Sequence, residues 1–397
     1  MDPFSLNLRH IRALSEIVTR GSVSAAAESV HLSQPALTQG IAKMERQLGL
    51  RLFERGTKGM EPTPEGLLLA ERAAAAIRHL RGGGRGARGM AHPEQLLTAT
   101  QLRAFVALVD NGSFAAAAQA TGQSQPALHR AVRDLEQLFA LPLVERRGRT
   151  VALTGAGQKL ARAARLAASE LTAGIAETHP EEDRRGGRII VGAMPLCRAL
   201  VLPRAISRFV RAWPRAKIDV IEGSWRELVD PLRDGEIDLM IGALRDDDPP
   251  DLVQSPLMID RLAVIGRANH PLTGRAPALP DLARYPWIVG NAGSPLRAHW
   301  ETLFDEGVAP DAPIECGSVM VIRSVLAESD FLTLLSVDQV ALELDAGMLG
   351  IIAGPLERVV RTIGISRRAS WRPTRAQSEL IALVEEVARE TRISENQ

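Results

Sequence analysis

At 397 residues, with 45% hydrophobic and 24% charged side chains, the chain has the composition of a soluble globular protein of two to four domains. It has neither a long uncharged apolar run nor a basic-then-apolar start, so neither a membrane span nor a signal peptide is expected. Its two distant cysteines, Cys197 and Cys316, argue against a disulfide framework or a cysteine zinc site and favour the cytoplasm. Net charge is +1, but residues 1–179 hold 22 Lys and Arg against 15 Asp and Glu, which favours a polyanionic partner for that half.

The chain begins with a helical pattern. Leu14 and Ile17 belong to an apolar series at helical spacing, which predicts a first amphipathic helix. Ser22 can cap a short second helix. A third helix is expected after Ser33, because Ser33 can cap it and Pro35 is tolerated in a first turn that needs no intrahelical donor.

The third helix is expected to bury one face and to expose the N-terminal end of its opposite face. The buried stripe is Leu37, Ile41, Met44 and Leu48. The residues expected to meet DNA are Ser33, Gln34, Pro35, Thr38 and Gln39. Two short helices around a tight turn, the second starting with small polar side chains, are typical of a helix-turn-helix that places its second helix in the major groove.

The next stretch, RLFERGTKGMEPTPEG at 51–66, predicts a wing. Its pattern is a short strand, a basic turn with Arg55 and Lys58, and a second extended piece. These two cations are expected to contact phosphates and position the domain. Thr63 can cap the helix that follows, with Pro64 at its first position.

The whole pattern occurs twice. SQPAL stands at 33–37 and again at 124–128, an offset of 91 residues. At that offset, a Gly-Ser pair, an Ala triplet, a Glu-Arg pair, and a Thr and Gly three apart all coincide without a gap. The sequence therefore predicts two copies of one domain. The DNA-facing residues expected in the second copy are Ser124, Gln125, Pro126, His129, Arg130, Arg146, Arg147 and Arg149.

Each copy is followed by a predicted linker. We expect the first domain and a short linker helix over 6–80, a flexible Gly/Arg-rich tether over 81–95, and the second domain with a longer linker helix over 96–180. The tether contains GxGxxG at 84–89, but a helix precedes it where a nucleotide-binding loop needs a strand. A dinucleotide site is therefore not expected there.

Each copy resembles the N-terminal domain of LysR-type transcriptional regulators. That family carries, in order, GSF-x-x-AA, SQPA-x-S, LE-x-x-LG-x-x-LF-x-R and T-x-x-G. Copy one keeps LGLRLFER, whereas copy two has LFALPLVER, so that Phe139 and Ala140 replace the Leu-Gly pair. Both copies lack the serine after SQPA-x, with Thr38 and His129 in its place.

The resemblance implies a dimer and raises a question about the second copy. The family normally has one such domain, whose linker helix pairs antiparallel with that of a partner chain. Here the two linker helices of one chain could pair with each other as an internal pseudo-dimer. Alternatively, copy one could read an additional half-site and raise affinity through tethering.

The C-terminal half alternates strands and helices from Arg188, which predicts a parallel sheet. The resemblance implies a two-lobed, periplasmic-binding-protein-like (type 2) effector domain over 187–397. We expect lobe I at 187–261 and 364–397 and lobe II at 262–363. The predicted fold class is thus α/β overall, with two tandem winged helix-turn-helix domains before this effector domain.

A ligand is expected between the lobes, because open α/β sheets bind ligands beyond the carboxyl ends of their strands. The candidate residues are Met194, Pro195, Leu196, Ser224, Trp225, Asn291, Gly293, Ser294, Ser318 and Ser336. Several of them precede helices, whose free amides suit a carboxylate or another anion. Each serine can also be an ordinary helix cap, and Trp225 can be packing.

Nothing in the sequence favours an enzyme. HExxH, GxSxG and P-loop motifs are absent, and no catalytic residue, metal or cofactor is expected. We predict a cytoplasmic transcriptional regulator that binds double-stranded DNA and forms a homo-oligomer, either dimer or tetramer. It should respond to a small-molecule effector, for which the helix starts favour an anion. The alternative is a ligand-binding or scaffold protein in which one helix-turn-helix copy serves pairing.

Overall fold

The computed structural model describes residues 1–56, 59–83, 92–148, 150–179, 187–194, 201–245, 249–304, 309–356 and 359–395. They form two compact units, a helical N-terminal unit up to Gly187 and an α/β unit from Arg188, with the short piece Asp234–Glu236 grouped with the first. Among the described residues, no helix is long and apolar enough to cross a membrane.

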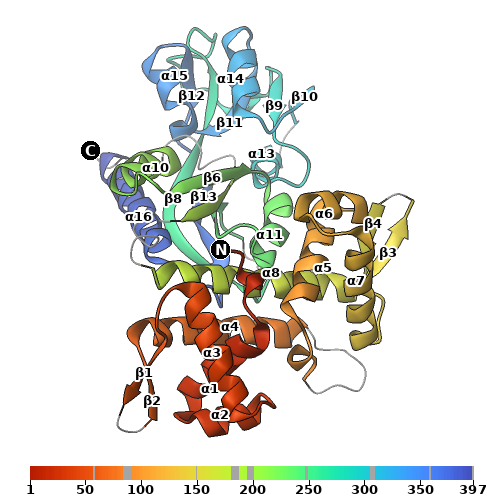
Figure 1. The fold of residues 1–397 in the computed structure, drawn as a ribbon. Coiled ribbons are helices and arrows are strands. Elements are labelled where there is room, and N and C mark those ends of the chain that lie inside the picture. The colour runs from red at the N-terminus through yellow and green to blue at the C-terminus, as the bar shows by residue number, and fades with distance from the viewer. Residues whose placement is uncertain are drawn as a thin grey trace. The chain divides into compact units, whose positions relative to one another are not determined.

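The N-terminal unit contains the same series of elements twice (Figure 1). The first copy comprises η1 (Pro3–Ser5), α1 (Leu8–Arg20), α2 (Val23–Ser29), α3 (Gln34–Leu48), β1 (Phe53–Gly56), β2 (Gly59–Pro62) and α4 (Pro64–Gly83). The second comprises η2 (Pro93–Gln95), α5 (Ala99–Asn111), α6 (Phe114–Thr121), α7 (Gln125–Phe139), β3 (Val144–Arg147), β4 (Thr150–Leu153) and α8 (Gly155–Glu177). The predicted helices, wings and linker helices are all confirmed.

The predicted caps hold these helices in place. The Ser33 hydroxyl accepts a hydrogen bond from the Ala36 amide at 3.3 Å, and Ser22 caps α2 in the same way. The expected stripe of α3 is buried, with Leu37, Ile41 and Met44 each 1% exposed. Because one face of α3 is fixed in the core, its polar N-terminal face is left to solvent.

Both copies make the turn into the wing with the same hydrogen bonds. In copy one, the Glu45 carboxylate accepts from the Leu52 and Phe53 amides. In copy two, Glu136 does the same for the two equivalent amides. The shared Thr-x-x-Gly has a steric cause, since a Cβ on Gly66 would lie 2.0 Å from a backbone oxygen. The sequence repeat therefore encodes a repeated tertiary structure.

Copy two keeps this turn despite having alanine in place of glycine. Gly49 ends α3 in the left-handed region at φ +69°, and Ala140 ends α7 there at φ +50°. Alanine is disfavoured in this region because its Cβ crowds the following carbonyl. Copy two thus adopts the backbone geometry of copy one at an energetic cost.

Ala140→Gly is expected to stabilise the N-terminal unit. Relief of the left-handed strain exceeds the extra freedom glycine gives the unfolded chain, so we expect a gain of about 0.5–1 kcal/mol. Urea unfolding followed by circular dichroism measures it as a higher midpoint. The matched control, Gly49→Ala, should lower the midpoint, and a lower midpoint for Ala140→Gly would contradict the strain.

The two linker helices pair with each other within the chain. The C-terminal Gly83 of α4 lies against the start of α8, where an added Cβ would be 2.3 Å from that of Ala163. At the other end, Gly174 lies against Arg72, with a corresponding distance of 2.9 Å to the Arg72 Cβ. The helices are therefore antiparallel, and residues of both copies share one hydrophobic core.

This pairing has an internal two-fold relation. Gly83 and Gly174 differ by the repeat offset of 91, as do Arg72 and Ala163, so the two close contacts are equivalent. The N-terminal turns are exchanged in the same way. Arg12 of copy one donates to the Glu94 carbonyl beside copy two at 2.9 Å, and its equivalent in copy two, Arg103, pairs with Asp2. These reciprocal contacts are the signature of an isologous interface formed inside one chain.

A buried ion cluster lies on this interface. The Arg72 guanidinium donates to Glu170 at 2.9 Å and bonds Glu177 through two of its nitrogens. Burial by itself would lower the pKa of Arg72, but its hydrogen bonds to Glu177 and Glu170 outweigh burial and raise the pKa above the ordinary value. The cation is therefore firmly held in its charged form.

The α/β unit is built on one continuous nine-stranded arrangement. Its elements are β5 (Arg188–Ala193), α10 (Val201–Ala212), β6 (Lys217–Glu222), α11 (Trp225–Asp234), β7 (Leu239–Ala243), β8 (Leu252–Arg267), α12 (Leu279–Leu282), β9 (Trp287–Val289), α13 (Pro295–Leu303), β10 (Ile314–Glu315), α14 (Val319–Ala327), β11 (Leu332–Ser336), η3 (Val337–Val340), α15 (Ala341–Asp345), β12 (Leu349–Ala353), β13 (Val360–Arg368) and α16 (Arg375–Glu395).

The strand directions correct one expectation. β5 runs parallel to β6 and β7, and β9 runs parallel to β10 and β11, as predicted. β8 and β13, however, are antiparallel to each other and to their other neighbours. The reason is that these two strands carry the chain across between the two strand groups, outward in β8 and back in β13. Separate hydrophobic clusters at the opposite ends of these two strands form the two lobes.

Candidate functional site: two exposed helix starts and an effector cavity

The start of α3 presents polar side chains to solvent. Gln34, Thr38 and Gln39 are exposed, as are Ser33 and Pro35. The Thr38 hydroxyl donates to the Gln34 carbonyl at 3.0 Å, and the Ser24 hydroxyl on α2 donates to the Gln34 side chain at 3.2 Å. α2 therefore orients the first side chain of the helix expected to read bases.

The start of α7 repeats this arrangement with one difference. Ser124, Gln125, Pro126 and Arg130 are exposed. His129, at the position of Thr38, is only half-buried and stacks on Phe114 with ring centroids 3.6 Å apart. The sequence could not show this contact, because Phe114 approaches His129 only once α6 packs on α7. Copy two thus exposes fewer of its predicted reading residues than copy one.

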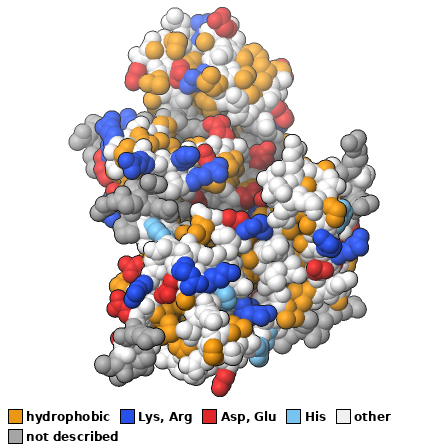
Figure 2. Space-filling model, in the orientation of Figure 1, with side chains coloured by type: hydrophobic (Ala, Val, Ile, Leu, Met, Phe, Trp, Pro, Cys, Tyr) orange, Lys and Arg blue, Asp and Glu red, His pale blue; other side chains and the backbone are white. Residues whose placement is uncertain are grey.

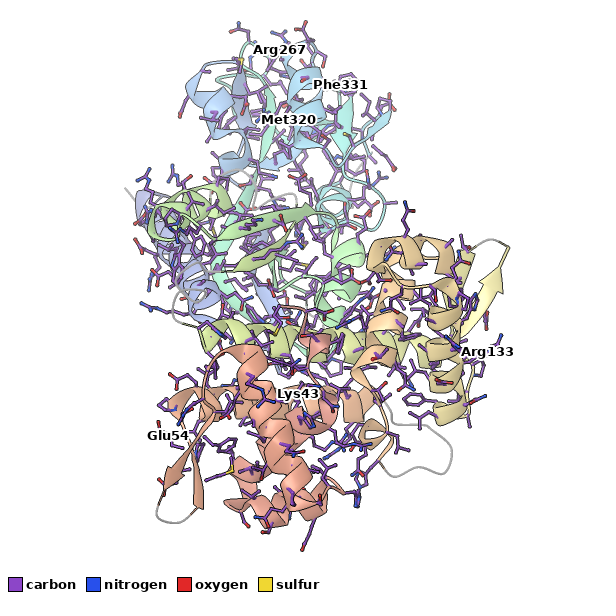
Figure 3. All side chains as sticks on the ribbon, in the orientation of Figure 1. Lys43, Glu54, Arg133, Arg267, Met320 and Phe331 are labelled. Carbon is purple, nitrogen blue, oxygen red and sulfur yellow. The ribbon has the colours of Figure 1, made fainter. Side chains whose placement is uncertain are left out.

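Exposed cationic side chains also lie further along both of these helices. Lys43 on α3 and Arg133 on α7, both exposed, were not among the predicted DNA contacts, whose cations were Arg130 and those of the wings (Figure 3). Figure 2 shows Lys and Arg side chains on the visible face of the N-terminal unit. The pKa of His10 is lowered by burial and then by the charges of Lys43 and Arg9, which indicates a positive local field.

The wing cations predicted as phosphate contacts are only partly described. Arg55, Arg146 and Arg147 stand on strands β1 and β3, but their side chains lie outside the described part of the structure. Lys58 and Arg149 lie outside the described residues altogether, as does most of the predicted tether. Their roles remain predictions from the sequence.

The α/β unit contains a cavity of about 320 Å³. It lies where β5, β7 and β9 end and where α11 and α13 begin, at the carboxyl ends of the strands. This is the place that the open α/β sheet predicts for a ligand. The Ser294 hydroxyl caps α13 by accepting from the Arg297 amide at 3.2 Å, so this serine is both a helix cap and part of the wall.

The cavity brings together six of the ten predicted ligand residues. They are Met194, Ser224, Trp225, Asn291, Gly293 and Ser294. Pro195 and Leu196 lie outside the described residues. Ser318 and Ser336 are described but do not line the cavity. Ser318 caps α14, and Ser336 is buried at the start of η3. For these two serines the structure favours the plain cap or core interpretation.

Three arginines in the cavity wall were not predicted. Arg226, Arg245 and Arg361 line it, and none of the lining residues among those the structure describes is Asp or Glu. The Arg245 guanidinium lies 5.8 Å from the ring centre of Trp225, and Arg361 forms a buried ion pair with Asp260 at 2.6 Å. No sequence spacing joins these arginines, because they come from three distant segments.

Family models match each part of the chain. A model described as the bacterial regulatory helix-turn-helix protein of the lysR family matches residues 8–67 and again 99–158. A model of the LysR substrate binding domain matches residues 182–389. The repeat inferred from the sequence is therefore recovered independently. The substrate binding domain match covers more than half of the chain.

Named relatives and solved structures agree. The chain is 32% identical to the HTH-type transcriptional regulator GalR of Pseudomonas putida over 97% of this chain and 98% of that protein. It is 33% identical to the SDS degradation transcriptional activation protein of a Pseudomonas species, over 64% of this chain and 83% of the relative. A full-length OxyR variant from Pseudomonas aeruginosa aligns with a TM-score of 0.57 and 25% identity, covering 72% of this chain and 97% of its own.

Proposed function

The chain belongs to the LysR family of DNA-binding transcriptional regulators with an effector-binding domain, and on this premise we propose that one chain supplies both DNA-reading modules of a family dimer. The observation that carries this proposal is the reciprocal pairing of α4 with α8. The family makes its dimer by pairing such linker helices between two chains. Here both partners of that pair come from one chain.

The reading residues follow from the two exposed helix starts. In this proposal Ser33, Gln34, Pro35, Thr38 and Gln39 of copy one face bases of one half-site. In copy two the corresponding residues are Ser124, Gln125, Pro126, His129 and Arg130. Gln and Arg side chains suit base edges in the major groove, and the wing cations would hold phosphates. The domains would extend as the sequence divides them, 6–80, 96–180 and 187–397.

The cavity is proposed to bind an anionic effector such as a carboxylate. Arg226 and Arg245 line the wall, and none of the described lining residues is a carboxylate, which favours negative charge; the α11 and α13 starts add amides and a positive dipole end. Binding would shift the two lobes between alternative arrangements and so bias the DNA-bound form. Further assembly into a homo-oligomer, dimer or tetramer, would use surfaces other than the α4–α8 pair. A cytoplasmic location completes the proposal.

Binding of the purified chain to the DNA upstream of its own gene tests this function. We expect binding that weakens steeply with salt, because each neutralised phosphate adds about 0.9 to the slope of log K against log salt. Gel shift or fluorescence anisotropy at several salt concentrations measures the slope. Absence of binding at low salt, with and without candidate acids, would remove the DNA-binding part of the proposal.

A further inference from the structure

We propose that the buried cluster of Arg72, Glu170 and Glu177 is a pairing code that directs α4 to α8 and away from a second copy of itself. The inference rests on the geometry of the helix pair and not on DNA reading. The Arg72 and Glu170 side chains are only 4% and 6% exposed, and Glu177 is 15% exposed. A cluster so far from water acts on the choice of partner, since a member that loses its counter-charge is left buried and uncompensated.

The cluster occupies only one of two equivalent places. The internal two-fold relation maps Arg72 onto Ala163 and Glu170 onto His79. Position 86, equivalent to Glu177, is glycine in the sequence and lies outside the described residues. Shape is therefore shared by the two halves of the interface, with glycines at 83 and 174, whereas the charges are not. This asymmetry distinguishes α4 from α8.

The asymmetry penalises pairs of like helices. Two α4 helices in the same antiparallel register would each place Arg72 against Gly83 and near His79 of the other, with no carboxylate to meet it. Two α8 helices would bury Glu170 against Ala163 and leave four carboxylates without a cation. Only α4 with α8 satisfies all three charged groups. A buried polar group that fixes partner and register is a known means of specificity, and it costs stability in the wrong pair.

The cluster therefore keeps the two DNA-reading modules of one chain together and discourages exchange with another chain through like helices. Sequence periodicity alone could not show this. Arg72 lies 98 residues before Glu170 and 105 before Glu177, and it meets them only through the antiparallel register. The partner selected by α4 is identified by its chemistry, a small-residue helix with two carboxylates placed to meet one guanidinium.

A cleavable form of the full chain provides the test. A specific protease site is inserted after Gly86, the protein is purified, and the chain is cut so that the two parts remain joined only by contacts. The quantity measured is the affinity of the N-terminal part for the rest of the cut chain, which is termed retention. Arg72→Glu should weaken retention by at least about 100-fold, and so should the double variant Glu170→Arg with Glu177→Arg. The combined triple variant, in which the charges are exchanged, should recover to within about tenfold of the original.

A matched control separates pairing from general damage. Arg78→Glu reverses a charge on the exposed face of the same helix and should change retention by less than about threefold. The N-terminal part released on dilution should have the mass of one fragment. If mismatched chains stay together as well as matched ones, if the exchange of charges fails to restore retention, or if the released part is dimeric, the code is wrong.

Neutral variants keep the test decisive if a charge reversal prevents folding. Arg72→Met leaves two carboxylates without their cation and should loosen the cut chain. Adding Glu170→Gln and Glu177→Gln removes the uncompensated charges and should tighten it again, because a fully apolar or neutral site avoids the burial penalty. An Arg72→Met chain as tight as the original, or a triple neutral chain no tighter than Arg72→Met, would overturn the proposal.

Discussion

Changing Gln34, Thr38 and Gln39 together to alanine is expected to reduce operator affinity by more than about 100-fold, since base contacts from such side chains contribute about 1–3 kcal/mol each. The fold should persist because all three side chains are exposed on α3. The slope of affinity against salt should barely change, since phosphate contacts are untouched. Fluorescence anisotropy with the upstream DNA measures both quantities.

The equivalent change in copy two tests whether that copy reads DNA or serves only pairing. Gln125→Ala with Arg130→Ala should also weaken binding and shorten the footprint at the other half-site. Gln47→Ala, an exposed change at the far end of α3, serves as the control and should have no effect. If the copy-two variant binds normally while the copy-one variant does not, copy two serves pairing rather than reading.

The second large effect is expected in the cavity. Arg226→Ala and Arg245→Ala should each weaken binding of an acidic effector by about 10–100-fold, because a charge-assisted hydrogen bond contributes about 1.5–3 kcal/mol. A thermal-shift screen of mono- and dicarboxylates on the full chain selects the acid, and calorimetry measures its affinity. Arg211→Ala, an exposed arginine of α10 outside the cavity wall, should leave affinity unchanged.

The result that would contradict this is equally direct. A neutral or cationic ligand whose affinity is unchanged by both arginine substitutions would show that the positive wall is not used for recognition. A ligand whose binding is abolished by Arg211→Ala as strongly as by Arg245→Ala would show that the effect is structural. Either outcome leaves the proposed DNA binding untouched.

Local elements were predictable because local chemistry determines them. Ser33 and Thr63 cap helices, and Gly66 permits a close backbone approach, wherever the surrounding pattern recurs. The exposed start of α3 also follows, since a buried stripe leaves only one place for the polar residues. Ala140 shows the limit, because its left-handed backbone is imposed by tertiary structure against its own preference.

The remainder depended on contacts between distant segments. Arg361 reaches the cavity from β13, far along the chain from Arg226 and Arg245, and no spacing rule connects them. The stacking of His129 on Phe114 was likewise not predictable, because it is set by how α6 packs on α7. The internal pairing of the linker helices also depended on the register of α4 against α8, which the Gly83 and Gly174 contacts supply.

The central claim is that a single chain brings two reading modules to DNA as one paired body. Native mass spectrometry of the complex with operator DNA gives the number of bound chains. Footprinting of the same operator gives the number of protected half-sites, and the two numbers are compared. We expect twice as many protected half-sites as bound chains, with one half-site lost for each copy disabled. Equal numbers of half-sites and chains would contradict the claim, because each chain would then read DNA with one module only.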